Sequence, residues 1–168
     1  AARAWAPWST AANQGLADDA LASTTPKHAI GEAVSTLRLS PINAVAIRTA
    51  AMASALGGST AAGEQLMGIA VSLGWRDPVT QLWAIGASQQ TGEPDKAVQR
   101  AQALFQQNVF IPSSLELLLR DAPNGPTATS LVQALASRPE WRPQFVKAAA
   151  QLPPNYGGNV SLLAFRLD

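Results

Sequence analysis

Apolar residues recur at spacings of three and four along most of the chain. One such stripe is Ala29, Ala33 and Leu37, and another is Leu115 with Leu118. This spacing places apolar side chains on one face of an α-helix, whereas a half-buried β-strand would alternate apolar and polar residues. No stretch alternates β-branched with polar residues. The pattern therefore predicts an all-α fold.

Prolines preceded by a side-chain oxygen mark the expected starts of several helices. Ser40-Pro41 and Asp77-Pro78 each place a capping oxygen before a proline at the first helical position. Glu93-Pro94 is a weaker version of the same arrangement. Ser113 and Glu116 have the spacing of a capping box, in which two side chains bond reciprocally to the first helical turn. We expect helices to begin at these positions.

Three turn dipeptides separate the expected helices, namely Gly57-Gly58, Thr91-Gly92 and Asn124-Gly125. Connections of about two to five residues make successive helices antiparallel neighbours. Periodicity, caps and turns together predict about eight to ten helices. Their expected positions are near residues 10–23, 27–38, 41–56, 60–73, 78–90, 94–107, 112–121, 127–137, 141–151 and 159–167.

The spacing between the two turn glycines, Gly58 and Gly92, recurs elsewhere in the chain. The same shift relates Gly63 to Ala97, two small residues at points where paired helices are expected to approach closely. A helix pair with this spacing matches the period of tetratricopeptide arrays, which is about 34 residues.

The segments that share this period resemble degenerate bacterial tetratricopeptide proteins. The resemblance is carried by residues 39–48 (LSPINAVAIR), by Gly57-Gly58, by Arg76-Asp77-Pro78 and by Gln81-Leu82-Trp83. Residues 138–145 resemble a segment near the end of such proteins, and the similarity extends over about residues 15–150. Two residues depart from the family pattern: Ile85 stands where it prefers a small residue, and Gln81 where it prefers tryptophan.

This resemblance implies a right-handed solenoid of antiparallel helix pairs, formed by residues 1–168 as a single domain. The expected repeats span residues 10–43, 44–77, 78–111 and 112–145, with capping helices over residues 141–168. The two middle repeats fit the pattern well and the outer two fit loosely. Trp75, Trp83 and Trp141 are expected to pack as wedges between stacked repeats.

Composition argues against most kinds of chemistry. Apolar residues make up 47% of the 168 residues, and 12 basic against 11 acidic residues give a net charge of +1. That balance offers no electrostatic case for nucleic-acid binding. Cysteine is absent and His28 is the one histidine, which excludes disulfides and cysteine or multi-histidine metal sites. His28 is expected to form a surface pair with Glu32.

We therefore assign no catalytic, metal or cofactor residues, and predict a non-catalytic scaffold or adaptor that binds a protein or peptide partner. One rival is the helical part of a glycan-processing enzyme, for which the candidate glutamates are Glu64, Glu116 and Glu140. Another is a structural dimerisation module with an exposed apolar patch on the last helices. That patch would contain Leu162, Leu163 and Phe165.

In a right-handed solenoid, the first helix of each pair lines the concave face. The expected partner-binding residues on that face are Gln14, Asp18, Arg48, Met52, Leu82, Gln89 and Gln90. Arg48 is the single cation among them, so a neutral or partly apolar peptide suits this face better than an acidic tail. A second role for Arg48 is equally open, because it could form an intramolecular ion pair with Asp18.

The resemblance also implies a bacterial cell-envelope setting, with a role in exopolysaccharide assembly or export. The expected location is the periplasm, free or held by an upstream membrane anchor that this chain does not contain, with the cytoplasm as the alternative. No window in the sequence reaches the roughly 18–20 uninterrupted apolar residues of a membrane span. Trp5 and Trp8 are expected to pack on the first helix, or to belong to a juxtamembrane stub.

Overall fold

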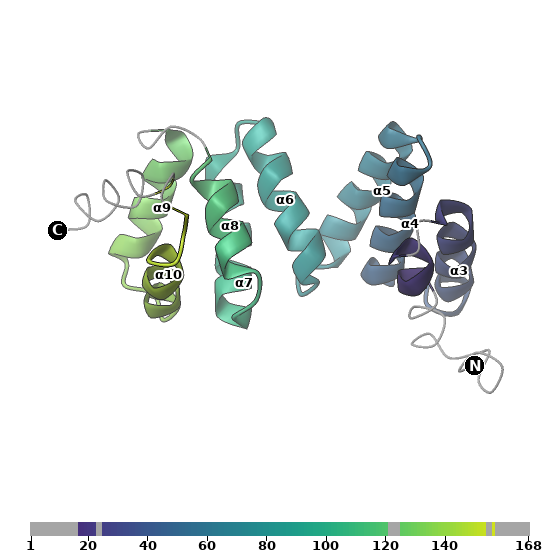
Figure 1. Ribbon diagram of the computed structural model, residues 1–168, viewed down its shortest axis with the longest axis horizontal. Coiled ribbons are helices and arrows are strands. Elements are labelled where there is room, and N and C mark those ends of the chain that lie inside the picture. The colour runs from purple at the N-terminus through teal and green to yellow at the C-terminus, as the bar shows by residue number, and fades with distance from the viewer. Residues whose placement is uncertain (1–16, 23–24, 121–124, 154–155, 157–168) are drawn as a thin grey trace. The chain divides into compact units, whose positions relative to one another are not determined.

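The computed structural model describes residues 17–22, 25–120, 125–153 and 156, and no β-strand occurs among them. Residues 17–22 are helical, and eight complete helices follow within the described part of the chain (Figure 1). These helices are α3 (Pro26–Leu39), α4 (Ala44–Leu56), α5 (Thr60–Leu73), α6 (Pro78–Gln90), α7 (Pro94–Gln107), α8 (Ile111–Leu118), α9 (Pro126–Ala136) and α10 (Arg142–Ala149). The predicted all-α class is confirmed.

Helix boundaries recur at the spacing that separates Gly58 from Gly92. Helices α3, α5 and α7 begin at Pro26, Thr60 and Pro94, and each contains 14 residues. Helices α4 and α6 begin at Ala44 and Pro78, and each contains 13 residues. Residues 26–107 therefore repeat the same two helix lengths and the same connections, as the spacing of small residues and turns predicts.

The turns after α4 and α6 share one backbone conformation. Gly58 has a φ of 90° and Gly92 a φ of 70°, which lie in the left-handed region that favours glycine. A side chain at either position would be strained, so glycine at these two positions is a requirement of the turn. Both turns also share a backbone hydrogen bond, from Ser59 N to Ser54 O at 2.9 Å and from Glu93 N to Ser88 O at 2.8 Å.

Two of the predicted helix caps are wrong, although both helices begin close to their expected positions. Helix α4 begins after Asn43, whose side-chain oxygen accepts a hydrogen bond from Ala46 N at 3.0 Å, while Pro41 lies in the preceding turn. Asn43 therefore caps the first turn of α4, in place of the cap expected at Ser40. Helix α8 begins at Ile111, so Ser113 lies inside the helix and does not form the expected capping box.

The other two predicted helix starts hold. Asp77 caps α6, since its Oδ2 accepts a hydrogen bond from Thr80 N at 3.1 Å. Pro94 begins α7, but the side chain of Glu93 makes no cap hydrogen bond to the helix backbone. It contacts Lys96 and Thr91 instead, and these hydrogen bonds lower the pKa of the Glu93 carboxyl below its ordinary value.

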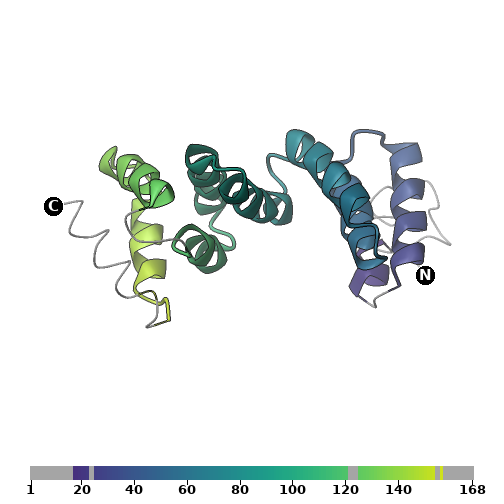
Figure 2. The ribbon, with the colours of Figure 1, turned by 90° about the horizontal axis from the view of Figure 1, so that it is seen from above.

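The chain divides into two compact units, residues 1–80 and residues 81–168, with the boundary inside α6. We call them the first and the second unit. In the first unit, α4 packs against both α3 and α5, and Figures 1 and 2 show the three helices side by side. Small side chains dominate its core, so the helices approach closely. The buried members of its hydrophobic clusters are Ala17, Ala20, Ala29, Ala33, Ile47, Ala50, Ala51, Ala53, Met67 and Ala70.

The contact between α4 and α5 depends on Gly63. A Cβ atom built on Gly63 would lie 2.8 Å from Ala51 O, closer than real Cβ contacts, and 3.1 Å from Ala55 Cβ. The close approach expected at this position is therefore confirmed. Ala97, its counterpart in the next helix pair, is fully buried in the second unit.

We expect Gly63→Ala to lower the free energy of unfolding by about 1–3 kcal/mol, because the added methyl group overpacks a backbone contact. The matched control is Gly68→Ala in the same helix, where an added Cβ meets nothing within 4 Å. That change should raise the free energy of unfolding by about 0.5–1 kcal/mol through helix propensity. Urea denaturation followed by circular dichroism measures both, and stabilisation by both changes would contradict the tight contact.

The second unit has a larger core that contains an aromatic cluster. The ring centroid of Phe105 lies 5.0 Å from that of Trp141 and 6.1 Å from that of Phe145. All three side chains are buried among aliphatic residues of α7 to α10. Trp141 thus packs inside the unit, whereas Trp75 and Trp83 are 45% and 38% exposed, and their role as wedges between repeats stays a prediction.

Candidate functional site

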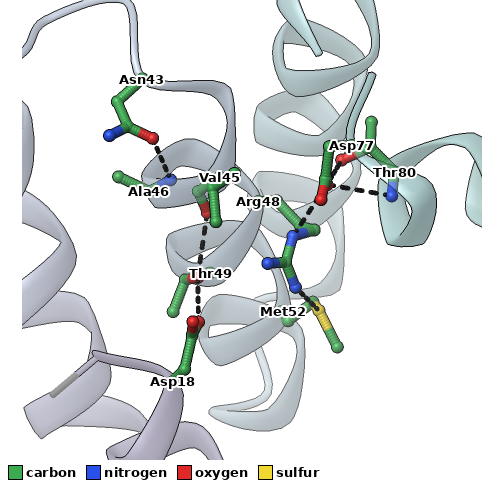
Figure 3. A network of polar contacts seen from close by, with 9 residues as sticks. All are labelled: Asp18, Asn43, Val45, Ala46, Arg48, Thr49, Met52, Asp77 and Thr80. Carbon is green, nitrogen blue, oxygen red and sulfur yellow. Dashed lines mark hydrogen bonds and ion pairs between the residues drawn. The ribbon is translucent and has the colours of Figure 1, made fainter. Parts of the chain in front are cut away.

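A nearly buried ion pair joins α4 to the start of α6 in the first unit. Arg48 Nε lies 3.0 Å from Asp77 Oδ2, and the two side chains are 11% and 10% exposed. The Nε–H bond is not aligned with that oxygen, so the contact is an ion pair and not a hydrogen bond. Figure 3 shows the Asp77 carboxylate between Arg48 and Thr80. Asp77 therefore neutralises Arg48 and caps α6 at once.

Asp18 contacts Thr49, the residue that follows Arg48. Thr49 Oγ1 lies 3.1 Å from Asp18 Oδ1 and 2.9 Å from Val45 O (Figure 3). Adjacent residues on an α-helix point about 100° apart, so α4 presents Thr49 to Asp18 and turns Arg48 toward the loop after α5. The expected ion pair between Arg48 and Asp18 is wrong, and Asp77 takes the place of Asp18.

The remaining residues of the predicted concave face have varied surroundings. Met52 packs against the core of the first unit, with Sδ 3.9 Å from Arg48 Nη1. In the second unit, Leu82 is half-buried against the core, Gln89 Nε2 donates to Leu117 O at 2.8 Å, and Gln90 is exposed. Gln14 lies outside the described residues. A binding face made of all seven residues stays a prediction.

A hollow of about 660 Å³ lies next to the Arg48–Asp77 pair. Its floor depends on Gly74, where an added Cβ would lie 2.8 Å from Ala70 O and 2.9 Å from Ala44 Cβ. Glycine therefore lets the loop after α5 approach the start of α4. The lining residues are Ala44, Val45, Leu73, Gly74, Trp75, Arg76, Asp77 and Pro78.

Four large apolar side chains at this end of the first unit are exposed. Short connections make α3, α4 and α5 antiparallel, so the ends of α3 and α5 and the start of α4 share one end of the unit (Figure 1). Ile42 is 78% exposed, and Leu39, Leu73 and Trp75 are 46%, 48% and 45% exposed. We call these four residues the apolar end. Turns are usually polar, so the apolar residues in these two turns were the sequence signal for the apolar end.

Two other sequence predictions concern acidic side chains. Glu32 is 8% exposed, so it does not lie on a solvated surface, as the predicted pair with His28 expects. Glu64 and Glu140 are exposed and Glu116 is half-buried. Among the residues that the structure describes, no group of three or more side chains could hold a metal ion.

None of the described helices is both long and apolar enough to cross a bilayer. The apolar residues proposed for the two termini lie outside the described residues. They are Trp5, Trp8, Leu162, Leu163 and Phe165.

Comparisons of the chain with protein-family models, with curated proteins and with solved structures found no match. The tetratricopeptide resemblance therefore stays a prediction from the residues that carry it. No relative supplies a site or an activity for this chain.

Proposed function

We propose that this chain is a non-catalytic, helical-repeat scaffold or adaptor that binds a protein partner through the apolar end of its first unit. The observation that carries the proposal is the exposure of Leu39, Ile42, Leu73 and Trp75 at one end of a closely packed helix group, beside a hollow. Exposed apolar side chains gathered in one place are characteristic of interaction surfaces.

The chemistry around the hollow favours a protein segment as the occupant. Trp75 and Leu73 offer apolar contact, and tryptophan is enriched among residues that dominate binding energy. Arg76 is exposed at the same hollow, while the charge of Asp77 is balanced by Arg48. The lining of the hollow therefore presents one unbalanced positive charge, which complements a partner segment that carries apolar side chains and one carboxylate.

The regular recurrence of helix starts and lengths supports a right-handed solenoid of antiparallel helix pairs similar to tetratricopeptide arrays. Stacked repeats of this kind form frames that hold binding residues on fixed helices and short loops. The resemblance supports a bacterial cell-envelope setting, with exposure to the periplasm. A role in exopolysaccharide assembly is part of the same proposal and depends on the resemblance alone.

Replacing Trp75 with alanine tests the proposal. The immobilised chain is expected to capture a partner from a bacterial envelope extract, and Trp75→Ala should reduce the captured amount about tenfold or more, because truncation of a central tryptophan typically costs at least about 2 kcal/mol of binding. The measurement is quantitative mass spectrometry of the captured proteins at equal loading of each variant.

The matched control is Trp83→Ala, which removes a tryptophan of similar exposure from the second unit. This control should capture the same partner as the unchanged chain, and both variants should keep the unchanged circular dichroism spectrum. Equal capture by the unchanged chain and by Trp75→Ala would show that the apolar end is not the binding surface.

A further inference from the structure

A second surface, on the second unit, carries three positive charges around one hollow. The hollow measures about 700 Å³, and its lining residues are Arg138, Pro139, Arg142, Pro143, Val146 and Lys147. Among the described residues, no ion pair engages these three cationic side chains. We propose that this hollow, which we call the α10 hollow, binds an acidic segment of a partner protein in which carboxylates flank an apolar side chain.

Packing on the opposite side of α10 fixes which residues face the hollow. Trp141 and Phe145 are 4% and 5% exposed, and Ala148 continues the same buried face. Arg142 borders this buried face and is half-buried, whereas Val146 and Lys147 are exposed. The buried aromatic cluster thus leaves these three side chains of α10 at the surface.

Local backbone preferences do not account for the two arginines. Arg142 is the first residue of α10, where the helix dipole disfavours a cation. Arg138 has a φ of 52°, a conformation that asparagine or glycine adopts far more readily. Lys147, in contrast, lies in the last turn of α10, where a cation suits the dipole. Both arginines line the hollow, and their planar donor groups match carboxylates with two parallel hydrogen bonds.

The apolar residues that line the α10 hollow indicate which class of ligand it would bind. Pro139, Pro143 and the 57% exposed Val146 contribute apolar surface between the charges. A nucleic-acid strand is disfavoured, because the exposed Glu140 follows Pro139 and the whole chain has a net charge of only +1. An acidic peptide with one apolar side chain satisfies both the charges and the apolar lining.

This site is independent of the apolar end. The two surfaces belong to different units, and they select different chemistry. Trp75→Ala should therefore leave binding at the α10 hollow unchanged, and removal of the arginines should leave capture at the apolar end unchanged. A negative result at the apolar end therefore leaves the proposal for the α10 hollow standing, and the reverse also holds.

The test uses a phage library of random dodecapeptides selected on the full chain. The expected result is enrichment of peptides with two or more carboxylates close to one aliphatic or aromatic residue. The most enriched peptide is then synthesised with a fluorescent label and titrated by anisotropy. Its affinity should fall about tenfold or more in the double variant Arg138→Asn/Arg142→Gln, in which asparagine also suits the positive φ.

The matched control is Arg38→Gln/Arg120→Gln, which removes the same charge from two exposed positions outside the hollow. It should change the affinity less than about twofold, because distant surface charges are screened by salt. An equal loss in both double variants would overturn the proposal in favour of general charge attraction. It would also be overturned by a selection without carboxylate enrichment, or by vesicles of phosphatidylglycerol binding the chain while no acidic peptide does.

Discussion

Replacement of Phe105 by alanine is expected to lower the free energy of unfolding by about 3–5 kcal/mol, one of the largest effects of any single change in this protein. Phe105 is 1% exposed, and its ring touches both Trp141 and Phe145. Removing it would leave a cavity at the centre of the aromatic cluster and remove two favourable ring contacts. Thermal and urea denaturation followed by circular dichroism measure the loss.

The control for this prediction is Phe110→Ala, the same truncation at a side chain that is 45% exposed. It should cost about 1 kcal/mol or less, because partly exposed side chains lose little burial when truncated. Similar losses for the two phenylalanines would contradict the packing described for the second unit.

Arg48→Met is expected to lower the free energy of unfolding by about 3 kcal/mol, because it breaks a nearly buried ion pair by removing one partner. The change keeps the apolar length of the side chain but leaves the Asp77 carboxylate, 10% exposed, without its counter-ion. The double variant Arg48→Met/Asp77→Asn should recover about 1–2 kcal/mol of this loss. Asparagine keeps an oxygen that can cap α6 at Thr80, yet it carries no charge. Urea denaturation of the three proteins measures these differences.

This pair of variants also separates the two roles of Arg48. A structural ion pair predicts reduced stability and recovery in the double variant, with partner affinity unchanged per folded molecule. A direct contact with a partner predicts weaker binding with stability nearly unchanged, and that outcome would restore the concave face as the binding surface. Arg76→Met is the control for stability, since Arg76 is exposed and its loss should change the free energy of unfolding by about 0.5 kcal/mol or less.

Contacts between helices that lie far apart in the sequence could not be predicted from periodicity. The amide of Gln89 donates to the backbone oxygen of Leu117, far along the chain, and no local pattern indicates this pairing. The apolar end was not predicted, because Ile42 and Trp75 lie in turns and helical periodicity does not report on residues outside helices. A run of large apolar residues in two turns at the same end of a repeat was the available signal.

The helices and their regular recurrence follow from short stretches of sequence. Capping by Asp77, the left-handed turn at Gly58 and the apolar periodicity of each helix involve residues within a few positions of one another, so a local pattern suffices to predict them. In contrast, tertiary packing determines which carboxylate forms the ion pair with Arg48. Asp18 precedes Arg48 and Asp77 follows it at nearly the same separation along the chain, so sequence distance does not distinguish them. The pairing depends on the rotation of α4 and on the close approach of the loop at Gly74, and packing between helices sets both.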